Sequence, residues 1–238
     1  MKIKFFTSIF IFLLSTPTYC EITNAHKLIK KEGLFYNKIT KKLFTGLVEF
    51  QYENGQLRAK GWLNKGKEQG YWEDYNEDGT LFSKGYYING SPSGNFKFYH
   101  ENGKLMSKGS YKNGKKVGIW EYYHDIGQLR TKGLVINGNQ EGPWETYHEN
   151  GRLRSKGIYK NGKAEGLWEH FYSDGKLKSK GNWKDNNPDG LWEEYHKNGQ
   201  LSYKYNYKDG KKDGVWVNFN QDGSLKKTET WKDGEKID

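Results

Sequence analysis

The chain contains little cysteine, little proline and no long hydrophobic run. Of its 238 residues, one is cysteine and four are proline. The apolar stretch from Phe5 to Leu14 is too short for a transmembrane helix, which needs about 20 apolar residues. No segment shows the sustained hydrophobic period of an amphipathic helix. A single cysteine cannot form a disulfide within the chain, so these absences favour a fold built from β-strands without covalent cross-links.

The sequence also lacks the local motifs of common catalytic sites. It has no phosphate-binding glycine loop, no His-Glu-x-x-His and no Gly-x-Ser-x-Gly. Catalysis needs a unique, converging set of nucleophile, base and electrostatic stabiliser. Here nearly every candidate residue recurs at a regular interval along the chain. We therefore expect a protein that is not an enzyme and that holds no cofactor.

What the chain does contain is a repeat of 24 residues. With a glycine at position 0 of each unit, position +9 is always glycine and position +11 is always leucine. Position +2 is aromatic in every unit except the first, which has Val48. A fixed period of about 20–50 residues indicates a repeat architecture, so residues 46–238 are predicted to form one array of eight units. The eight glycines at position 0 are Gly46, Gly70, Gly94, Gly118, Gly142, Gly166, Gly190 and Gly214.

Most units contain two turn signals, and these predict hairpins. The first is Asn-Gly or Asp-Gly at +8/+9, as in Asn102-Gly103, and the second is the same dipeptide at +19/+20, as in Asn113-Gly114. Such dipeptides supply the positive φ of a two-residue type I′ hairpin turn. We therefore expect an all-β fold in which tandem 24-residue β-hairpins form an elongated, twisted antiparallel meander sheet.

A two-residue first turn would pair positions whose numbers sum to 17. Trp at +2 then faces Gly at +15, whose bare backbone the ring can cover, and Glu at +3 faces Lys at +14, for example Glu121 with Lys132. Strand alternation places Leu at +11 on the Trp face and Tyr at +5 on the charged face. A single layer leaves the Trp face without a partner layer. We expect sheet curvature, a second copy or a ligand to cover it.

The N-terminal residues have a different organisation from the repeats. Residues 1–20 are predicted to be a secretory signal peptide, with Lys2 and Lys4 before the apolar stretch and cleavage near Cys20. Lipidation of Cys20 is the alternative. We therefore expect export to the periplasm, the outer-membrane surface or the medium. Residues 21–45 lie outside the glycine register, and the segments 33–36 and 42–46 are predicted to form an N-terminal capping hairpin.

The formal net charge is +10, or about +8 without Lys2 and Lys4, and no block of like charge occurs. Excess lysine keeps an edge-rich sheet soluble and prevents edge-to-edge pairing. The same excess would attract anionic lipid, acidic glycan or nucleic acid. With a secretory signal, nucleic acid is an unfavoured ligand, whereas interleaved Trp and Tyr also suit the apolar faces of sugar rings.

Four histidines share position +6 and could form a row. Neighbours in such a row would be roughly 10 Å apart, because each unit advances the sheet by two strand spacings. Zinc–nitrogen bonds measure about 2.0–2.1 Å, so we expect no metal site. Packing beside the hairpin turn is the favoured role, and a pH-sensitive surface is the alternative. These residues are His100, His124, His148 and His196.

The consensus Gly-x-Trp-x-x-Tyr-(x)3-Gly-x-Leu-(x)2-Lys-Gly-x-Tyr-(x)2-Gly-Lys resembles the bacterial variant of the MORN (membrane occupation and recognition nexus) repeat. The segment from Gly142 to Leu153 is a close instance, and the similarity covers about residues 33–238. This resemblance implies a hairpin array used for protein–protein or protein–lipid contact. The segment Phe44-Thr45-Gly46 is similar to the start of the array in proteins labelled YwqK-family antitoxins, which implies a partner toxin.

These observations predict an exported, non-enzymatic binding or scaffold protein. Its expected partner is a protein, a cell-envelope or host surface, or an anionic lipid. The alternative is an antitoxin-like protein that neutralises a toxin by direct binding. For the tryptophans, holding the sheet together is a role at least as well favoured as binding. The candidate contact residues are Trp120, Trp144, Trp168, Trp192, Tyr123, Tyr147 and Tyr195.

Overall fold

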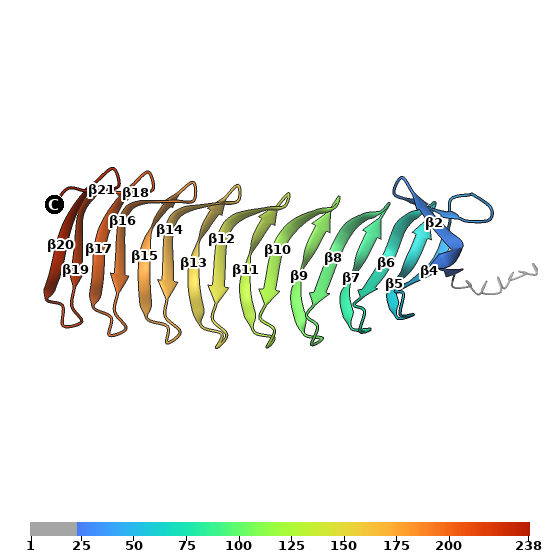
Figure 1. Cartoon of the computed structure of the whole chain (residues 1–238), viewed down its shortest axis with the longest axis horizontal. Coiled ribbons are helices and arrows are strands. Elements are labelled where there is room, and N and C mark those ends of the chain that lie inside the picture. Colours follow the sequence, from blue (N-terminus) through green and yellow to red (C-terminus); the bar gives the residue numbers. More distant parts are fainter. Residues whose placement is uncertain (1–22) are drawn as a thin grey trace, which may run out of the picture.

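Two strands from each unit pair in chain order and build one long, open, antiparallel meander sheet (Figure 1). The computed structural model describes residues 23–238, so the predicted signal peptide lies outside the described residues. The prediction of an all-β meander of tandem hairpins is confirmed. Within residues 23–238, no helix is long and apolar enough to cross a lipid bilayer.

The strands follow the repeat closely, with one strand before and one after each first turn. A 3₁₀ helix, η1 (Ala25–Lys27), is the one helical element of the described residues. The strands are β1 (Thr23–Asn24), β2 (Leu28–Lys31), β3 (Leu34–Asn37), β4 (Gly46–Gln51), β5 (Leu57–Asn64), β6 (Lys67–Tyr75), β7 (Leu81–Ile88), β8 (Ser91–Tyr99), β9 (Leu105–Lys112), β10 (Lys115–Tyr123), β11 (Leu129–Ile136), β12 (Asn139–Tyr147), β13 (Leu153–Lys160), β14 (Lys163–Phe171), β15 (Leu177–Lys184), β16 (Asn187–Tyr195), β17 (Leu201–Lys208), β18 (Lys211–Lys212), β19 (Gly214–Phe219), β20 (Leu225–Lys232) and β21 (Glu235–Lys236).

The second turn of each unit is the predicted two-residue turn. Lys112 pairs with Lys115, and the two residues between them, Asn113 and Gly114, have φ values of 51° and 76°. Positive φ at both central residues defines a type I′ turn, whose twist matches that of the flanking strands. This part of the turn prediction is confirmed.

The first turn differs from its prediction. The His124 amide donates to the Gln128 carbonyl at 2.8 Å, so three residues form the loop, and of these Gly127 alone has a positive φ, 93°. A three-residue loop of this kind combines a type I turn with a left-handed glycine. A bulge between Tyr122 and Tyr123 then adds one residue to the opposite strand. The predicted two-residue loop is therefore wrong. On the far side of the bulge from the turn, however, the numbers of paired positions sum to 17 as predicted, for example +4 with +13.

Because of that bulge, Leu at +11 does not share the Trp face. Leu129 pairs with Tyr123, and the corresponding leucines of other units pair likewise with the residue at +5. Directly opposed side chains of an antiparallel pair point to the same side of the sheet. The leucines therefore lie with the tyrosines on the charged face, which we call the outer face, and the prediction for their position is wrong.

A second irregularity explains the invariant glycine at position 0. Between strands β11 and β12, Gly133 pairs with Trp144 and Leu134 pairs with Glu141, so Gly142 and Pro143 form an extra loop in the strand. Gly142 has φ of 65°, which is a left-handed conformation that glycine adopts without a steric penalty. This two-residue bulge pushes the residue at +1 outward in each unit.

The core is made by tryptophan rings that lie flat on glycines. The predicted register is confirmed, because Trp120 pairs with Gly133. The Trp120 ring, however, covers Gly109 of the preceding unit, where an added Cβ would lie 2.3 Å from the indole. Its Nε1–H also donates to the Ser110 carbonyl at 3.3 Å. Each ring thus couples its own unit to the one before it.

Neighbouring rings complete the cover over this tryptophan face, which we call the inner face. Tyr111 meets Trp120 edge-on at 5.2 Å between ring centroids, and the Lys116 ammonium lies 4.0 Å from the indole centroid. As a result, Trp120 is fully buried although the sheet is a single layer. Side chains of the same sheet therefore bury this ring, whereas we expected sheet curvature, a second copy or a ligand to cover it.

The first unit is covered by residues that precede the array. Strands β2 and β3 form a separate hairpin, and its buried Leu28 and Phe35 pack in one cluster with Val48, Leu63 and Trp72. The segment 42–46 contributes an isolated bridge between Leu43 and Tyr36 rather than a full strand. Strand β1 pairs in parallel with β4 at the same end of the sheet. This hairpin shields the apolar end of the first unit from water, while the domain boundary at residue 45 stays a prediction.

Candidate binding surfaces

The four tryptophans predicted as contact residues lie in the core. Their exposed fractions are 0% for Trp120, 4% for Trp144, and 8% for both Trp168 and Trp192. Each donates its indole N–H to a backbone carbonyl of the preceding unit, as Trp144 does to Leu134 at 3.1 Å. In this structure they hold the units together, which is the alternative role that the sequence left open. A part in binding stays a prediction.

The three tyrosines predicted as contact residues lie on the outer face, each in a triad with a glutamate and a lysine. The Tyr147 hydroxyl donates to Glu145 Oε2 at 2.5 Å, and the Lys132 ammonium lies 2.9 Å from the same oxygen. Lys132 also lies 5.7 Å from the centre of the Tyr147 ring. Tyr123 and Tyr195 occupy the same place in their units. All three tyrosines are half-buried.

The ion pairs of these triads join neighbouring units, not the two strands of one unit. Lys108 lies 2.8 Å from Glu121 of the next unit, whereas we expected Glu121 to pair with Lys132. Each glutamate has a lysine opposite it on both neighbouring strands, so the register permits either partner. The hydrogen bonds from Lys108 and then from Tyr123 lower the pKa of Glu121. The triads therefore couple the units on the outer face, as the tryptophans do on the inner face.

The histidines at +6 form a ladder of hydrogen bonds along the first-turn edge. His148 Nε2 lies 2.9 Å from the Phe171 carbonyl of the next unit, and the other three histidines make the equivalent bond. Because a carbonyl oxygen only accepts, Nε2 carries the proton in this bond. The ladder places the histidines beside the hairpin turns, where the sequence analysis expected them. Among residues 23–238, no group of three His, Cys, Asp or Glu side chains is placed to hold a metal ion.

The outer face also carries a row of apolar side chains that the sequence analysis did not identify. They stand at position +1, where the bulge of each unit pushes the side chain outward. The signal was present in the sequence, since this position is apolar in seven of the eight units and follows the invariant glycine. We call these residues the outer row. Its most exposed members are Tyr71 (54%), Ile119 (58%), Leu167 (51%), Leu191 (46%) and Val215 (57%).

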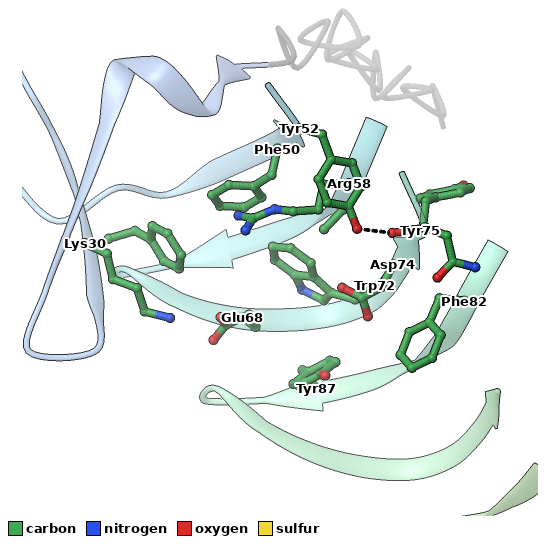
Figure 2. Close-up of a pocket in the computed structure, with 13 residues that line it drawn as sticks. Lys30, Phe50, Tyr52, Arg58, Glu68, Trp72, Asp74, Tyr75, Phe82 and Tyr87 are labelled. Carbon is green, nitrogen blue, oxygen red and sulfur yellow. Dashed lines mark hydrogen bonds between the residues drawn. The ribbon is translucent and has the colours of Figure 1, made fainter. Parts of the chain in front are cut away.

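The inner face carries a cavity of about 500 Å³ between the N-terminal hairpin and the first two units (Figure 2). Its walls are aromatic, with Phe50, Trp72 and Tyr87 among them. Charged groups of both signs point into it, including Arg58 and Asp74. The hairpin β2–β3 contributes Lys30 and Phe35 to its lining.

Electrostatics in this cavity centre on Asp74. Burial raises the pKa of Asp74, while a hydrogen bond from the Ser83 hydroxyl at 2.8 Å and the charge of Arg58 act against that rise. The arrangement can hold a ligand through aromatic contacts and charges of both signs.

The geometry defines a class: an open array of β-hairpins in which every unit is bonded to the next. A family model described as "MORN repeat variant" matches seven segments of the chain, and the chain belongs to that family. Repeats of this kind are generally non-catalytic and mediate binding. The matched residues are 44–61, 68–89, 92–113, 140–161, 164–185, 188–209 and 212–233.

The unit around Gly118 is absent from those matches, although strands β10 and β11 have the same geometry as their neighbours. Its first turn contains Ile126 where the other units have Asn or Asp. A search of curated proteins found no match.

Solved structures give only weak likenesses. A crystal structure of TcdB2-TccC3 aligns with 85% of this chain and 13% of that chain, at 13% identity and a TM-score of 0.20. A complex of alternansucrase with isomaltononaose aligns with 84% of this chain and 18% of that chain, at 16% identity and a TM-score of 0.18. This chain therefore spans less than a fifth of either protein, and scores this low do not indicate a shared fold.

Proposed function

We propose that this protein is an exported, non-enzymatic scaffold whose outer face binds a macromolecule of the cell envelope or of a host surface. The observation that carries the proposal is the outer row. Its members are about half exposed in a family whose repeats mediate binding. Exposed apolar side chains that gather on one face and are rimmed by polar residues mark interaction sites.

The surroundings of the outer row favour a protein partner over an anionic lipid. The adjoining stripe consists of lysines and glutamates already paired with each other, as in Lys132–Glu145 and Lys156–Glu169. A surface of mixed charge around an apolar stripe is complementary to another protein surface, whereas a lipid headgroup layer needs unpaired cations. The half-buried Tyr123, Tyr147 and Tyr195 would form the rim of this interface.

Photo-crosslinking in producing cells tests this proposal. A photoreactive residue placed at Leu167 or Leu191 should capture the same partner, and Phe82, which is 41% exposed but lies on the inner face, provides the matched control. A triple variant, Ile119→Ser with Leu167→Ser and Leu191→Ser, should lose the partner while its melting temperature changes by a few degrees at most. Equal capture from position 82, or binding that survives the triple variant, would refute the role of the outer row.

Export is tested separately by fractionation of cells that express the tagged full-length chain, with N-terminal sequencing of the product. A mature chain that starts at Glu21 outside the cytoplasm is the expected result, and an uncleaved cytoplasmic chain would contradict it. Neutralisation of a toxin by direct binding is the alternative function. Relief of growth arrest caused by a neighbouring toxin gene would support that alternative, and the same outer-row variants would show whether it uses this face.

A further inference from the structure

The inner face carries a second cavity, of about 750 Å³, near the C-terminal end of the array. It spans three units and reaches the first-turn edge, where Lys197 and Tyr172 line it. Its base holds Trp183 and Trp192, which meet edge-on at 5.5 Å. Its volume lies within the range of about 300–1,000 Å³ of small-molecule sites. It is remote in sequence from the cavity of Figure 2.

Two basic side chains, Arg154 and Lys178, line this cavity. Both stand at position +12, which is the residue that the bulge beside the first turn adds to its strand. Neither makes an ion pair with another of the described residues, whereas five of the lysines at position +14 do. The nearest interaction of the Lys178 ammonium is with the Tyr172 ring, whose centre lies 5.9 Å away. Two cations one repeat apart, on strands β13 and β15, therefore line the same cavity without an ion-pair partner among the described residues.

The residue that faces them sets this cavity apart from the one near the N-terminus. In the N-terminal cavity, Arg58 at +12 stands near a carboxylate at +4, Asp74. Here position +4 is His170, which stacks on Trp168 and whose pKa is lowered by burial and by the charges of Lys178 and Arg154. Arg154 thus stands near a neutral ring where Arg58 stands near a carboxylate, whereas Lys178 keeps a carboxylate, Glu194, at +4 of the next unit.

The charges that line the cavity do not cancel. Arg154, Lys178 and Lys197 are cationic, and Glu194 is the one carboxylate among the lining residues. Glu194 already accepts a hydrogen bond from the Tyr205 hydroxyl at 2.5 Å. An excess of two positive charges in an aromatic-walled recess favours an anionic ligand, and arginine binds carboxylate and phosphate through paired hydrogen bonds.

We propose that this cavity binds an anionic sugar, with its carboxylate or phosphate on Arg154 and Lys178 and the C–H face of its ring against Trp183. The cavity is much larger than a bare inorganic anion requires, and the aromatic wall supplies the apolar surface on which a pyranose ring stacks. This ligand site lies on the inner face, so it is separate from the macromolecular contact proposed for the outer face. Either function can fail without the other.

Calorimetric titration of the full chain with four probes tests the proposal. The probes are glucuronate, glucose 6-phosphate, glucose and inorganic phosphate. We expect glucuronate or glucose 6-phosphate to bind, with a shift of the His170 and Trp183 NMR signals, and we expect glucose and inorganic phosphate to bind at least about tenfold more weakly. The stronger of the first two identifies carboxylate or phosphate as the recognised group.

Variants assign the binding to the cavity. Arg154→Gln with Lys178→Gln should weaken binding by about tenfold or more, and Arg130→Gln, at the same position of a neighbouring unit but outside the cavity, should leave it unchanged. Circular dichroism and the melting temperature check that the variants fold. If a variant does not fold, the His170 and Trp183 shifts in the unmodified chain decide the question. No binding of either anionic sugar, equal binding of glucose, equal binding of inorganic phosphate, or equal loss in Arg130→Gln would each overturn the proposal.

Discussion

The contact between tryptophan and glycine predicts that a single methyl group destabilises the array. In Gly133→Ala, the new Cβ would lie 2.2 Å from Cδ2 of Trp144 and 2.3 Å from Cε2. Real Cβ atoms do not approach a ring so closely, so the indole must move away from the backbone. The backbone of Gly133 lies outside the left-handed region, so alanine itself fits the strand without strain.

Two effects of this substitution oppose each other. Replacing glycine by alanine at a compatible backbone position stabilises a protein by about 0.4–1 kcal/mol, because the unfolded chain loses freedom. Overpacking a close-packed site costs about 1–3 kcal/mol, and weakening the bond from Trp144 Nε1 to the Leu134 carbonyl adds about 1 kcal/mol. The second effect is larger, so we expect a net loss of about 1–3 kcal/mol, concentrated at the contact between these two units.

Urea unfolding followed by tryptophan fluorescence, together with native-state hydrogen exchange, measures this loss and its location. A double-mutant cycle with Trp144→Ala identifies its cause. Without the ring, Gly133→Ala should be neutral or stabilising. The reasoning is refuted if Gly133→Ala is as stable as the unmodified protein, or if it remains equally destabilising in the Trp144→Ala background.

Three further substitutions test the other couplings. Tyr147→Phe removes the hydroxyl that helps to lower the pKa of Glu145. A lowered pKa gives stability that is present above the usual glutamate pKa and is lost as pH falls through the lowered pKa. Thermal melts from pH 7 to pH 3 should therefore show a smaller acid-induced loss of stability in the variant, and the difference should be below about 1 kcal/mol because the pair is exposed. Tyr172→Phe leaves the carbonyl of the next unit without its 2.7 Å hydrogen bond and should cost about 1 kcal/mol in urea unfolding, and an unchanged midpoint would contradict a structural role for the first-turn ladder. Burial raises the pKa of Asp74, so ionisation of its carboxyl group at higher pH opposes folding. Asp74→Asn should therefore be more stable than the unmodified protein at pH 7 but not at pH 3. Equal stability of the two proteins at both pH values would contradict a destabilising effect of ionised Asp74.

The sequence predicts the repeat, the strands and the pairing of +2 with +15, because these depend on periodicity and on turn residues. It misled us on the first turn, where the Asn-Gly dipeptide suggested a type I′ turn. The one unit with Ile126 at +8 held the contrary signal, since a β-branched residue is strongly disfavoured at positive φ. Because no +8 residue has a positive φ, asparagine at +8 serves the loop through its side chain, as Asn102 does by accepting from the Lys104 amide.

Partner choice between units could not be predicted from pairing rules. Every interior strand has two neighbours, so Trp120 faces Gly109 on one side and Gly133 on the other, and Glu121 faces Lys108 and Lys132. The strand register permits either partner, so the direction in which each side chain points decides which of the two contacts forms. The N-terminal cavity was also beyond prediction, because it depends on how a non-repeating hairpin docks on the first unit.

The structure separates the residues that build the array from those left free to bind. Contacts between recurrent residues join one unit to the next: Trp packs on Gly, His bonds to a backbone carbonyl, and Lys pairs with Glu. This structural role explains why these residues recur without marking a ligand site. Positions +1, +4 and +12 differ from unit to unit: +4 is Phe50, which packs on Trp72 of the next unit, in one unit, Asp74 in another and His170 in a third. Since a solenoid keeps its fold while such positions vary, binding specificity can differ along the array at little cost in stability. His170→Asp should therefore abolish anionic-sugar binding in the C-terminal cavity in a chain that still folds, with a loss of stability at pH 7 of the kind that burial causes for Asp74, and unchanged binding of glucuronate and glucose 6-phosphate would contradict the role of position +4.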